Sequence, residues 1–371
     1  MSLANTYARY PVEFVSGSGC WLTDAKGDEY LDFLSGIAVN NLGHCHPAVV
    51  SAVQEQVGKL MHVSNLFYTD ANRSLAVRLA SRSLGGSVFF CNSGAEANEA
   101  AIKLVRKFKP RGDVVVALNA FHGRTYGALS ATPQESKQAP FAPLVPGFRA
   151  VDASEIPAAL DEHTAAVLIE PIQGESGVNV MSRELLASIR DACDAVGAAL
   201  VFDEVQTGMG RTGSLFAYEQ LGVVPDAMTL AKGLGGGLPV GALVMGEKLA
   251  NVLAPGDHGS TFAGGPVVSV AAHAVLDTID DEAFLARVRE AGEILLERLK
   301  ELPNVVSARG RGLMIAAEID AEAPDVAKRA LLDHKLIINA TGATTLRFLP
   351  PLIVSDAEID EALTRLAAAL T

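Results

Sequence analysis

The feature that most constrains this chain is an alternation of short apolar runs with amphipathic runs between about residues 50 and 275. In RELLASIRDACDAV (183–196), for example, apolar residues recur at helical spacing and Gly197 follows as a cap. The strand-like runs are SVFF (87–90), DVVVAL (113–118), AAVLIE (165–170), AALVFD (198–203), AMTLA (227–231) and GALVMG (241–246). This alternation predicts an α/β fold with a mostly parallel central sheet covered by helices on both faces.

The two ends of the chain follow other patterns. Residues 11–35 read as short strands around a turn at Lys26-Gly27-Asp28. After residue 275, we expect a small α+β domain made of a helix over 281–302, a strand over 313–319, a helix over 322–334, strands over 336–340 and 345–349, and a final helix over 356–370. We therefore divide the chain into an N-terminal segment (1–49) that packs with the small domain, a large domain (50–275) and a small C-terminal domain (276–371).

Composition excludes several classes of function. The formal net charge of −13 argues against a nucleic-acid partner, which would be bound through clustered Lys and Arg. No apolar stretch approaches the roughly 20 residues that a membrane span needs. The four cysteines are scattered and form no C-x-x-C, so we expect no disulfide framework and no metal site. The first residues lack an apolar signal core, and we therefore expect a cytoplasmic protein.

Asp203 and Lys232 each close an apolar strand-like run, and the glycine-rich GLGGG follows the lysine. Ligands of parallel sheets bind beyond the carboxyl ends of the strands. There, a lysine can condense with the aldehyde of pyridoxal phosphate, while a carboxylate keeps the pyridine nitrogen protonated. The alternative is a buried ion pair, or two unrelated residues at strand ends.

A phosphate site is indicated where NSGAEANEA (92–100) follows a strand and opens a helix. Ser93 and Glu96 have capping-box spacing. Gly94 and Ala95 place unobstructed backbone N–H groups at the helix amino end, where an anion binds. An ordinary well-capped helix is the alternative.

Two further segments carry residues suited to a planar ring and to carboxylates. In FHGRT (121–125), Phe121 could stack on a pyridine ring and Arg124 could grip a carboxylate, although a core aromatic and a surface arginine are the alternatives. Arg347 lies in an apolar surround, where an unpaired charge is costly, and Glu175 is its candidate partner. The two form either a switchable pair or a fixed structural salt bridge.

Two other patterns carry less weight. GMGRTG (208–213) matches a dinucleotide-binding pattern, but it begins five residues after a strand and lacks an acidic residue about 20 residues further on. We interpret it as a glycine-rich loop. His44-Cys45-His46 lacks a complementary ligand cluster, so a structural role is expected there.

DEVQTGMGRTG and the following VVPDAMTLAKGLGGGLPVGA resemble the signature of class III (ω-type) aminotransferases of fold type I. The motifs NSGAEANEA, FHGRT, EPIQGESGV, HGSTF and LRFLPPLIV match the family in the same order, so the resemblance runs from about residue 5 to the C-terminus. TYARYPVEFVSG, LDFLSGIAVNNLGHCHP and VSNLFY are most similar to acetylornithine aminotransferases. The resemblance implies pyridoxal 5'-phosphate as cofactor.

The resemblance also implies the roles of individual residues in cofactor binding. Lys232 would hold the cofactor covalently and then carry the proton between substrate and cofactor carbons. Asp203 would pair with the pyridinium nitrogen, Gln206 would bond the ring hydroxyl and Phe121 would stack on the ring. The remaining cofactor-binding assignments are Ser93, Gly94, Ala95 and Thr261 for the phosphate, together with Glu204 and Val205.

For the substrates, the resemblance implies transfer of the δ-amino group of acetylornithine to 2-oxoglutarate in arginine biosynthesis. Arg124 would bind the donor α-carboxylate, Ser260 would lie near the substrate, and Arg347, freed from Glu175, would hold a carboxylate of 2-oxoglutarate. Thr261 would come from the neighbouring subunit, so a homodimer is implied. The family continues S-T-F-G-G-N-P, whereas this chain has Ala263 and Gly265 in that loop, which puts the loop geometry beside the interface in doubt.

Rival functions remain open at this point. Within the family, ornithine, 4-aminobutyrate, succinylornithine or N-succinyl-diaminopimelate could be the donor. Outside it, GMGRTG would suit a nicotinamide-dependent dehydrogenase, and a chain that had lost catalysis could serve as a binding module. Retention of Lys232, Asp203, Arg124 and Thr261 together argues against that last reading.

Overall fold

The computed structural model describes residues 2–371 and centres on a seven-stranded sheet. Every pairing within this sheet is parallel except the two that β12 makes with β4 and β11. The strands in spatial order are β4 (Gly85–Cys91), β12 (Gly241–Gly246), β11 (Ala227–Leu230), β10 (Ala199–Asp203), β7 (Thr164–Ile169), β5 (Asp113–Ala117) and β6 (Phe148–Val151). The predicted mostly parallel α/β sheet is confirmed.

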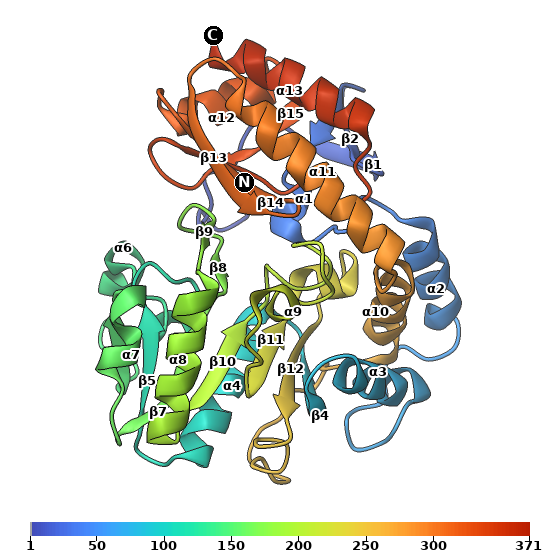
Figure 1. The fold of residues 1–371 in the computed structure, drawn as a ribbon. Helices are drawn as coiled ribbons and strands as arrows, with labels where there is room; N and C mark the ends of the chain where they lie inside the picture. The colour runs from blue at the N-terminus through green and yellow to red at the C-terminus, as the bar shows by residue number, and fades with distance from the viewer. Residues whose placement is uncertain (1) are drawn as a thin grey trace.

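Helices cover both faces of this sheet, as the alternation predicted (Figure 1). On one face, α4 (Gly94–Phe108) buries an apolar stripe that includes Ala97, Ala101 and Leu104. On the other, α8 (Arg183–Val196) buries Leu186, Ile189 and Cys193 and ends at Gly197, whose φ of 67° is the left-handed cap that favours glycine.

The remaining elements of this part of the chain frame the sheet. Beside β4 stand α2 (Pro47–Val57), α3 (Asp70–Ser81) and α10 (Pro266–Ile279) (Figure 1). The connections contain α5 (Tyr126–Ser130), α6 (Glu135–Gln138), α7 (Ile156–Ala159), α9 (Tyr218–Leu221), the hairpin β8 (Ile172–Gln173) and β9 (Asn179–Val180), and the 3-10 turns η1 (Ala139–Phe141), η2 (Ala153–Glu155) and η3 (Lys232–Gly235).

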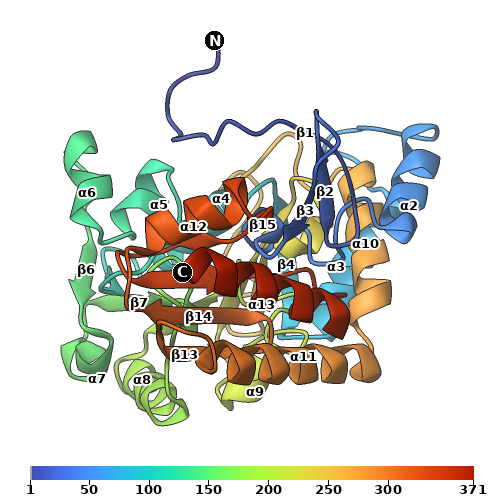
Figure 2. The ribbon, with the colours of Figure 1, turned by 90° about the horizontal axis from the view of Figure 1, so that it is seen from above.

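The C-terminal elements form a separate layer above the carboxyl ends of the central strands (Figures 1 and 2). A sheet in the order β13 (Val305–Arg311), β14 (Met314–Ile319), β17 (Thr345–Phe348) and β16 (Asn339–Ala340) packs with α11 (Glu282–Lys300), α12 (Ala323–Leu332) and α13 (Asp356–Leu370). The N-terminal strands β1 (Phe14–Ser18), β2 (Trp21–Asp24) and β3 (Glu29–Asp32) join this layer, because β3 pairs in parallel with β15 (Leu336–Ile337). The short α1 (Ser35–Ala38) follows β3.

Some predicted elements differ from those observed. The single strand expected over 336–340 is split into β15 and β16, which belong to different sheets. Strands β6 and β13 were not predicted, and α11 ends at Lys300, before Leu302. The proposed domain boundaries stay a prediction.

Candidate active site

A cavity of about 450 Å³ lies at the carboxyl ends of β10 and β11, beneath the C-terminal layer. Asp203 is the last residue of β10, and Lys232 opens η3 directly after β11 and Ala231. Both line the cavity. The parallel pairing of β10 with β11 brings these two residues to the same edge of the sheet.

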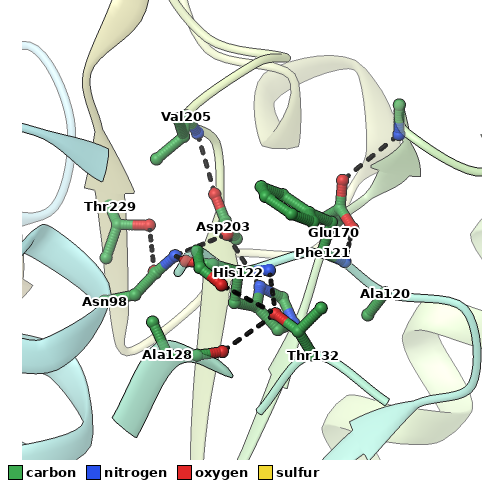
Figure 3. A network of polar contacts seen from close by, with 12 residues as sticks. Asn98, Ala120, Phe121, His122, Ala128, Thr132, Glu170, Asp203, Val205 and Thr229 are labelled. Carbon is green, nitrogen blue, oxygen red and sulfur yellow. Dashed lines mark hydrogen bonds and ion pairs between the residues drawn. The ribbon is translucent and has the colours of Figure 1, made fainter. Parts of the chain in front are cut away.

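Asp203 forms the floor of this cavity and is held by three hydrogen bonds (Figure 3). Its Oδ2 accepts from Asn98 Nδ2 at 2.7 Å and faces His122 Nδ1 at 2.7 Å, and its Oδ1 accepts from the Val205 amide at 3.0 Å. The carboxylate is 4% exposed. A buried carboxylate fixed in this way is placed to meet a cationic ring nitrogen, since its charge has no arginine or lysine partner of its own among residues 2–371.

Asn98, His122 and Thr229 extend this floor, and the sequence analysis did not single them out. Thr229 donates to Asn98 Oδ1 at 2.9 Å, which turns the Asn98 amide nitrogen toward Asp203. The His122 amide donates to Thr132 Oγ1 at 2.9 Å. Asn98, a polar residue beside the apolar stripe of α4, was the available signal, because a buried amide needs partners.

Glu170, placed directly after β7, is a further residue that was not predicted as part of the site. Its carboxylate accepts from the Phe121 amide at 2.8 Å and from the Gly174 amide at 3.2 Å, so it ties together the two loops that carry Phe121 and Glu175. Burial raises the pKa of Glu170 to about 7, with nearby Asp203 adding to the rise and His122 opposing it.

Lys232 stands free in the cavity. No side-chain hydrogen bond or ion pair of Lys232 is found within residues 2–371, and its backbone has a φ of 42°. Burial lowers the pKa of its amine and Arg347 adds to that effect, while the carboxylates of Glu175, Asp203 and Glu170 oppose it. A lysine with a lowered pKa is more often the neutral nucleophile that condensation with an aldehyde requires.

The amino end of α4 forms one wall of the cavity. Ser93 caps the helix by accepting from the Glu96 amide, and Ser93, Gly94 and Ala95 all line the cavity. A Cβ atom at Gly94 would lie 2.6 Å from Val205 Cγ1, so only glycine fits there. Backbone N–H groups at such a helix end are suited to a phosphate.

Arg347 is fully buried behind the cavity wall on the opposite side, where it contacts Glu175 and Gln206, which line the cavity. Its Nη1 donates to Glu175 Oε1 at 2.6 Å, to the Gly174 carbonyl at 2.9 Å and to Gln206 Oε1 at 3.3 Å. Burial would raise the pKa of Glu175, but the charges of Arg347 and Lys232 and the hydrogen bonds from Arg347 and Gln206 outweigh it and lower that pKa. The pair predicted from sequence is therefore in contact.

Phe121 and Arg124 lie at the mouth of the cavity. The Arg124 guanidinium is exposed and stands 5.6 Å from the centre of the Phe121 ring, and Lys137 Nζ stands 5.7 Å from the same centre. Burial lowers the pKa of Lys137, and the positive charge of Arg124 lowers it further. The mouth thus holds two cations side by side.

Four assigned residues do not line this cavity: the buried Arg347, and also Glu204, Thr261 and Ser260. The Glu204 carboxylate points away and accepts from the Ala217 and Tyr218 amides, and burial raises its pKa to about 7. Thr261 lines a separate small hollow together with residues 62–72. Ser260 lies at the edge, where its Oγ accepts from the Asn92 side chain at 3.0 Å. Val205 and Gln206 do line the cavity.

Comparison with known proteins identifies the family to which the chain belongs. A family model described as aminotransferase class-III matches residues 2–370. The chain belongs to the class-III aminotransferase family. It is 48% identical to the acetylornithine aminotransferase of Caldanaerobacter subterraneus subsp. tengcongensis over 97% of this chain and 95% of that relative. It is 46% identical to the acetylornithine aminotransferase of Methanocaldococcus jannaschii over 95% of this chain and 92% of that relative.

Solved structures of the family share the fold. An ornithine aminotransferase from Toxoplasma gondii superposes with a TM-score of 0.94 at 33% identity and covers all of this chain and 92% of its own. The N-acetylornithine aminotransferase of Stenotrophomonas maltophilia superposes with a TM-score of 0.83 at 37% identity, covering 98% and 96% of the two chains. The fold type that the resemblance implied is confirmed.

Pyridoxal phosphate is the cofactor of this enzyme class, and the cavity fits it. A free lysine, a fixed carboxylate and a helix amino end shaped by Gly94 line one cavity, as the three parts of this cofactor require. Within residues 2–371, no cluster of three or more His, Cys, Asp or Glu side chains could hold a metal ion. No helix in the same range is long and apolar enough to cross a membrane.

Proposed function

We propose that this enzyme moves the δ-amino group of N2-acetyl-L-ornithine to 2-oxoglutarate, giving N-acetyl-L-glutamate 5-semialdehyde and L-glutamate, as a step of arginine biosynthesis. The observation that carries the proposal is the pair of buried Arg347 and partly exposed Glu175 near Lys232, because it can present either a neutralised or a free guanidinium to the substrate. The identities of 44–48% to acetylornithine aminotransferases support it.

The fixed residues would act in both halves of the reaction. The cofactor, once bound, supplies an electron sink for the carbon that loses its proton. Asp203 would hold the ring nitrogen protonated, and Phe121 would fix the plane of the ring. Lys232 would release the cofactor to the substrate and then move the proton, a task for which its lowered pKa suits it.

The adjustable residues would distinguish the two substrates. Acetylornithine brings one carboxylate and 2-oxoglutarate brings two. With the donor, Glu175 would neutralise Arg347, which avoids an uncompensated buried charge. With the acceptor, Arg347 would exchange Glu175 for the second substrate carboxylate, using the bidentate geometry that guanidinium groups favour. Arg347 Nη2 is buried and has no partner within residues 2–371, so it is available for that exchange.

The mouth favours an acylated donor over ornithine itself. Ornithine carries a second ammonium group on its α-carbon, whereas the acetyl group of acetylornithine makes that nitrogen neutral. Arg124 and Lys137 both place positive charge beside the Phe121 ring, which repels an α-ammonium and attracts the α-carboxylate. Ornithine nevertheless remains the second candidate donor, because the ornithine aminotransferase of T. gondii has the same fold at a TM-score of 0.94.

We further propose a homodimer in which Thr261 of each subunit completes the cavity of the other. Large apolar side chains are exposed on two neighbouring segments near the hollow that Thr261 lines: Met61, Leu66, Phe67, Tyr68 and Phe262, at 66% to 91% exposure. Contiguous exposed apolar surface of this kind is typical of an interface. The cysteines are all free and three are buried, which suits the reducing cytoplasm.

A half-reaction assay tests the proposal. Purified enzyme loaded with pyridoxal phosphate would be mixed with acetylornithine, ornithine or 4-aminobutyrate in the absence of acceptor, and the change in cofactor absorbance would be followed. We expect acetylornithine to react with the highest kcat/KM. A preference for ornithine or 4-aminobutyrate would contradict the proposed donor.

A further inference from the structure

Arg211, within the GMGRTG loop, is a fully buried arginine that bonds to neutral partners. Its Nη1 donates to the carbonyls of Leu313 at 3.0 Å and Pro350 at 2.5 Å, and its Nη2 donates to Asn41 Oδ1 at 2.8 Å. Within residues 2–371, Arg211 forms no ion pair, and Asp32 is the charge that acts on it. Burial lowers the pKa of Arg211 to about 9, so its guanidinium stays charged at neutral pH.

The two carbonyls belong to the ends of the strand pair that carries Arg347. In the antiparallel pairing of β14 with β17, Ile315 faces Phe348, so Leu313 and Pro350 lie opposite each other just beyond the pair. One guanidinium nitrogen of Arg211 thus binds both strands just beyond the last hydrogen-bonded pair between them. Arg347 lies on β17, three residues before Pro350.

The third partner, Asn41, connects this grip to the catalytic lysine. Asn41 Nδ2 donates to the Met209 carbonyl at 2.7 Å, and the Asn41 carbonyl accepts from the Leu352 amide at 2.7 Å. Its side chain also packs on the backbone of Gly233, the residue after Lys232: a Cβ atom at Gly233 would lie 2.2 Å from Asn41 Nδ2. The same junction therefore touches the loop of Lys232 and the strand of Arg347.

Direct backbone contact makes the junction rigid. The Leu313 amide donates to the Arg211 carbonyl at 3.0 Å. Gly312, whose φ is +54°, presses so closely on this loop that a Cβ atom there would lie 2.5 Å from the Thr212 carbonyl carbon. The C-terminal layer is thus locked against the loop that begins shortly after Asp203 and Gln206.

We propose that Arg211 is a positioning residue that sets the place of Arg347 relative to Lys232, and thereby the affinity for the dicarboxylate acceptor. The inference rests on the proposed function, in which Arg347 holds the second carboxylate of the acceptor. Arg211 is remote from the donor carboxylate site at Arg124 and does not line the cavity, so its effect on the donor half-reaction is small. A planar fork that holds two carbonyls and an amide is not replaceable by lysine.

The test compares the two half-reactions of Arg211→Lys. We expect KM for 2-oxoglutarate to rise by about tenfold or more, because misplacing a binding group by about 1 Å costs up to about a hundredfold. KM for acetylornithine should stay within about twofold. Arg289→Gln is the matched control, since Arg289 also bonds this loop, at the Gly213 carbonyl, but comes from α11 and forms no hydrogen bond to β14 or β17. The control should leave both KM values unchanged.

A double-mutant cycle separates positioning from general damage. In an Arg347→Gln background, Arg211→Lys should change the acceptor KM by less than about twofold further, since its action runs through Arg347. If Arg211→Lys does not fold, Gly312→Ala perturbs the same junction without removing a charge, and it must give the same acceptor-selective pattern.

Three results would overturn the inference. Equal losses in both half-reactions would make Arg211 merely structural. An unchanged acceptor KM in Arg211→Lys, with a raised one in Arg347→Gln, would leave the proposed function intact and refute only the role of Arg211. An unchanged acceptor KM in Arg347→Gln would refute the proposed role of Arg347 and the inference with it.

Discussion

The floor of the cavity and its substrate side, which consists of Arg124, Glu175 and Arg347, are built in contrasting ways. At the floor, Asp203 receives three hydrogen bonds, from Asn98, His122 and the Val205 amide, and is almost completely buried. On the substrate side, Arg124 is exposed at the mouth, and the buried Arg347 shares one nitrogen among three acceptors while its other terminal nitrogen has none within residues 2–371. The floor is fixed, whereas the substrate side retains hydrogen-bond donors that have no partner.

This difference follows the chemistry of a two-substrate reaction. The ring of the cofactor is the same in both half-reactions, so the groups under it gain from being preorganised. The substrates differ in charge, so the groups around them must change partners. Substitutions at the floor should therefore slow both half-reactions equally, and substitutions on the substrate side should affect the two half-reactions unequally.

Asp203→Asn should have the largest effect. The substitution keeps the size of the side chain but removes the charge that stabilises a protonated ring nitrogen. We expect kcat of both half-reactions to fall by about a hundredfold to a thousandfold, in equal proportion. Asp226→Asn is the control, because Asp226 is a carboxylate at the other end of the sheet, paired with Arg190 and Lys248. Stopped-flow absorbance measures both half-reactions. An effect confined to one half-reaction would contradict the claim that the floor acts equally in both.

Arg347→Gln should have the next largest effect, and only on the half-reaction with 2-oxoglutarate. Loss of a charge-assisted contact worth about 1.5–3 kcal/mol should raise KM for 2-oxoglutarate by about ten- to a hundredfold. KM for acetylornithine should change little. Arg309→Gln is the matched control, since Arg309 lies on the same small sheet but bonds Gly177 and Glu318 away from the cavity. Steady-state kinetics with each substrate varied in turn would detect the asymmetry, and its absence would contradict the account.

Glu204→Gln should change stability and not substrate choice. The pKa of Glu204 is raised from 4.5 to about 7 in the folded state, so ionisation opposes folding as pH rises from about 4.5 and does so fully above about 7. Between pH 4.5 and pH 8, the unfolding free energy of the variant should rise relative to that of wild type by about 3 kcal/mol. Urea unfolding of variant and wild type at the two pH values measures this change. If the difference in unfolding free energy does not depend on pH, the pKa of Glu204 is the same in the folded and unfolded states.

Lys137→Gln should have the smallest effect. Removing one of the two cations at the mouth weakens the repulsion of an α-ammonium, and partly exposed charges contribute about 0.2–1 kcal/mol. The preference for acetylornithine over ornithine, expressed as a ratio of kcat/KM values, should fall by about two- to fivefold. An unchanged ratio would show that the acyl group is recognised by shape alone.

Much of the fold could be predicted from the sequence because the relevant signals are local. The bounds of α8, α13 and β12 agree with the prediction to the residue, since apolar periodicity and cap residues mark them. The antiparallel direction of β12 could not be predicted, because direction is decided by pairing with β4 and β11. The polar sequence of β13 hid a strand whose partner, β14, supplies the stability.

The site divides in the same way. Asp203, Lys232 and the Arg347–Glu175 pair were predicted because strand ends and misplaced charges are visible in sequence. The structure places Asp203, Lys232 and Glu175 in the lining of one cavity, with Arg347 bound to Glu175 behind the wall. Asn98 and His122 reach Asp203 from 105 and 81 residues away, so no local pattern reports the contact. Glu204 shows the opposite error: it adjoins Asp203 in sequence, but its side chain points to the other side of the strand end.

The most direct test of the account is Glu175→Gln, which keeps Asp203 and its three hydrogen bonds and removes the negative charge that Glu175 places beside Arg347, Gln206 and Lys232. We predict that the ratio of acceptor to donor kcat/KM shifts by about tenfold, because the donor now faces an uncompensated guanidinium, while affinity for pyridoxal phosphate stays as in wild type. Equal changes in both half-reactions, or loss of the cofactor, would contradict the claim that this pair exchanges partners between substrates.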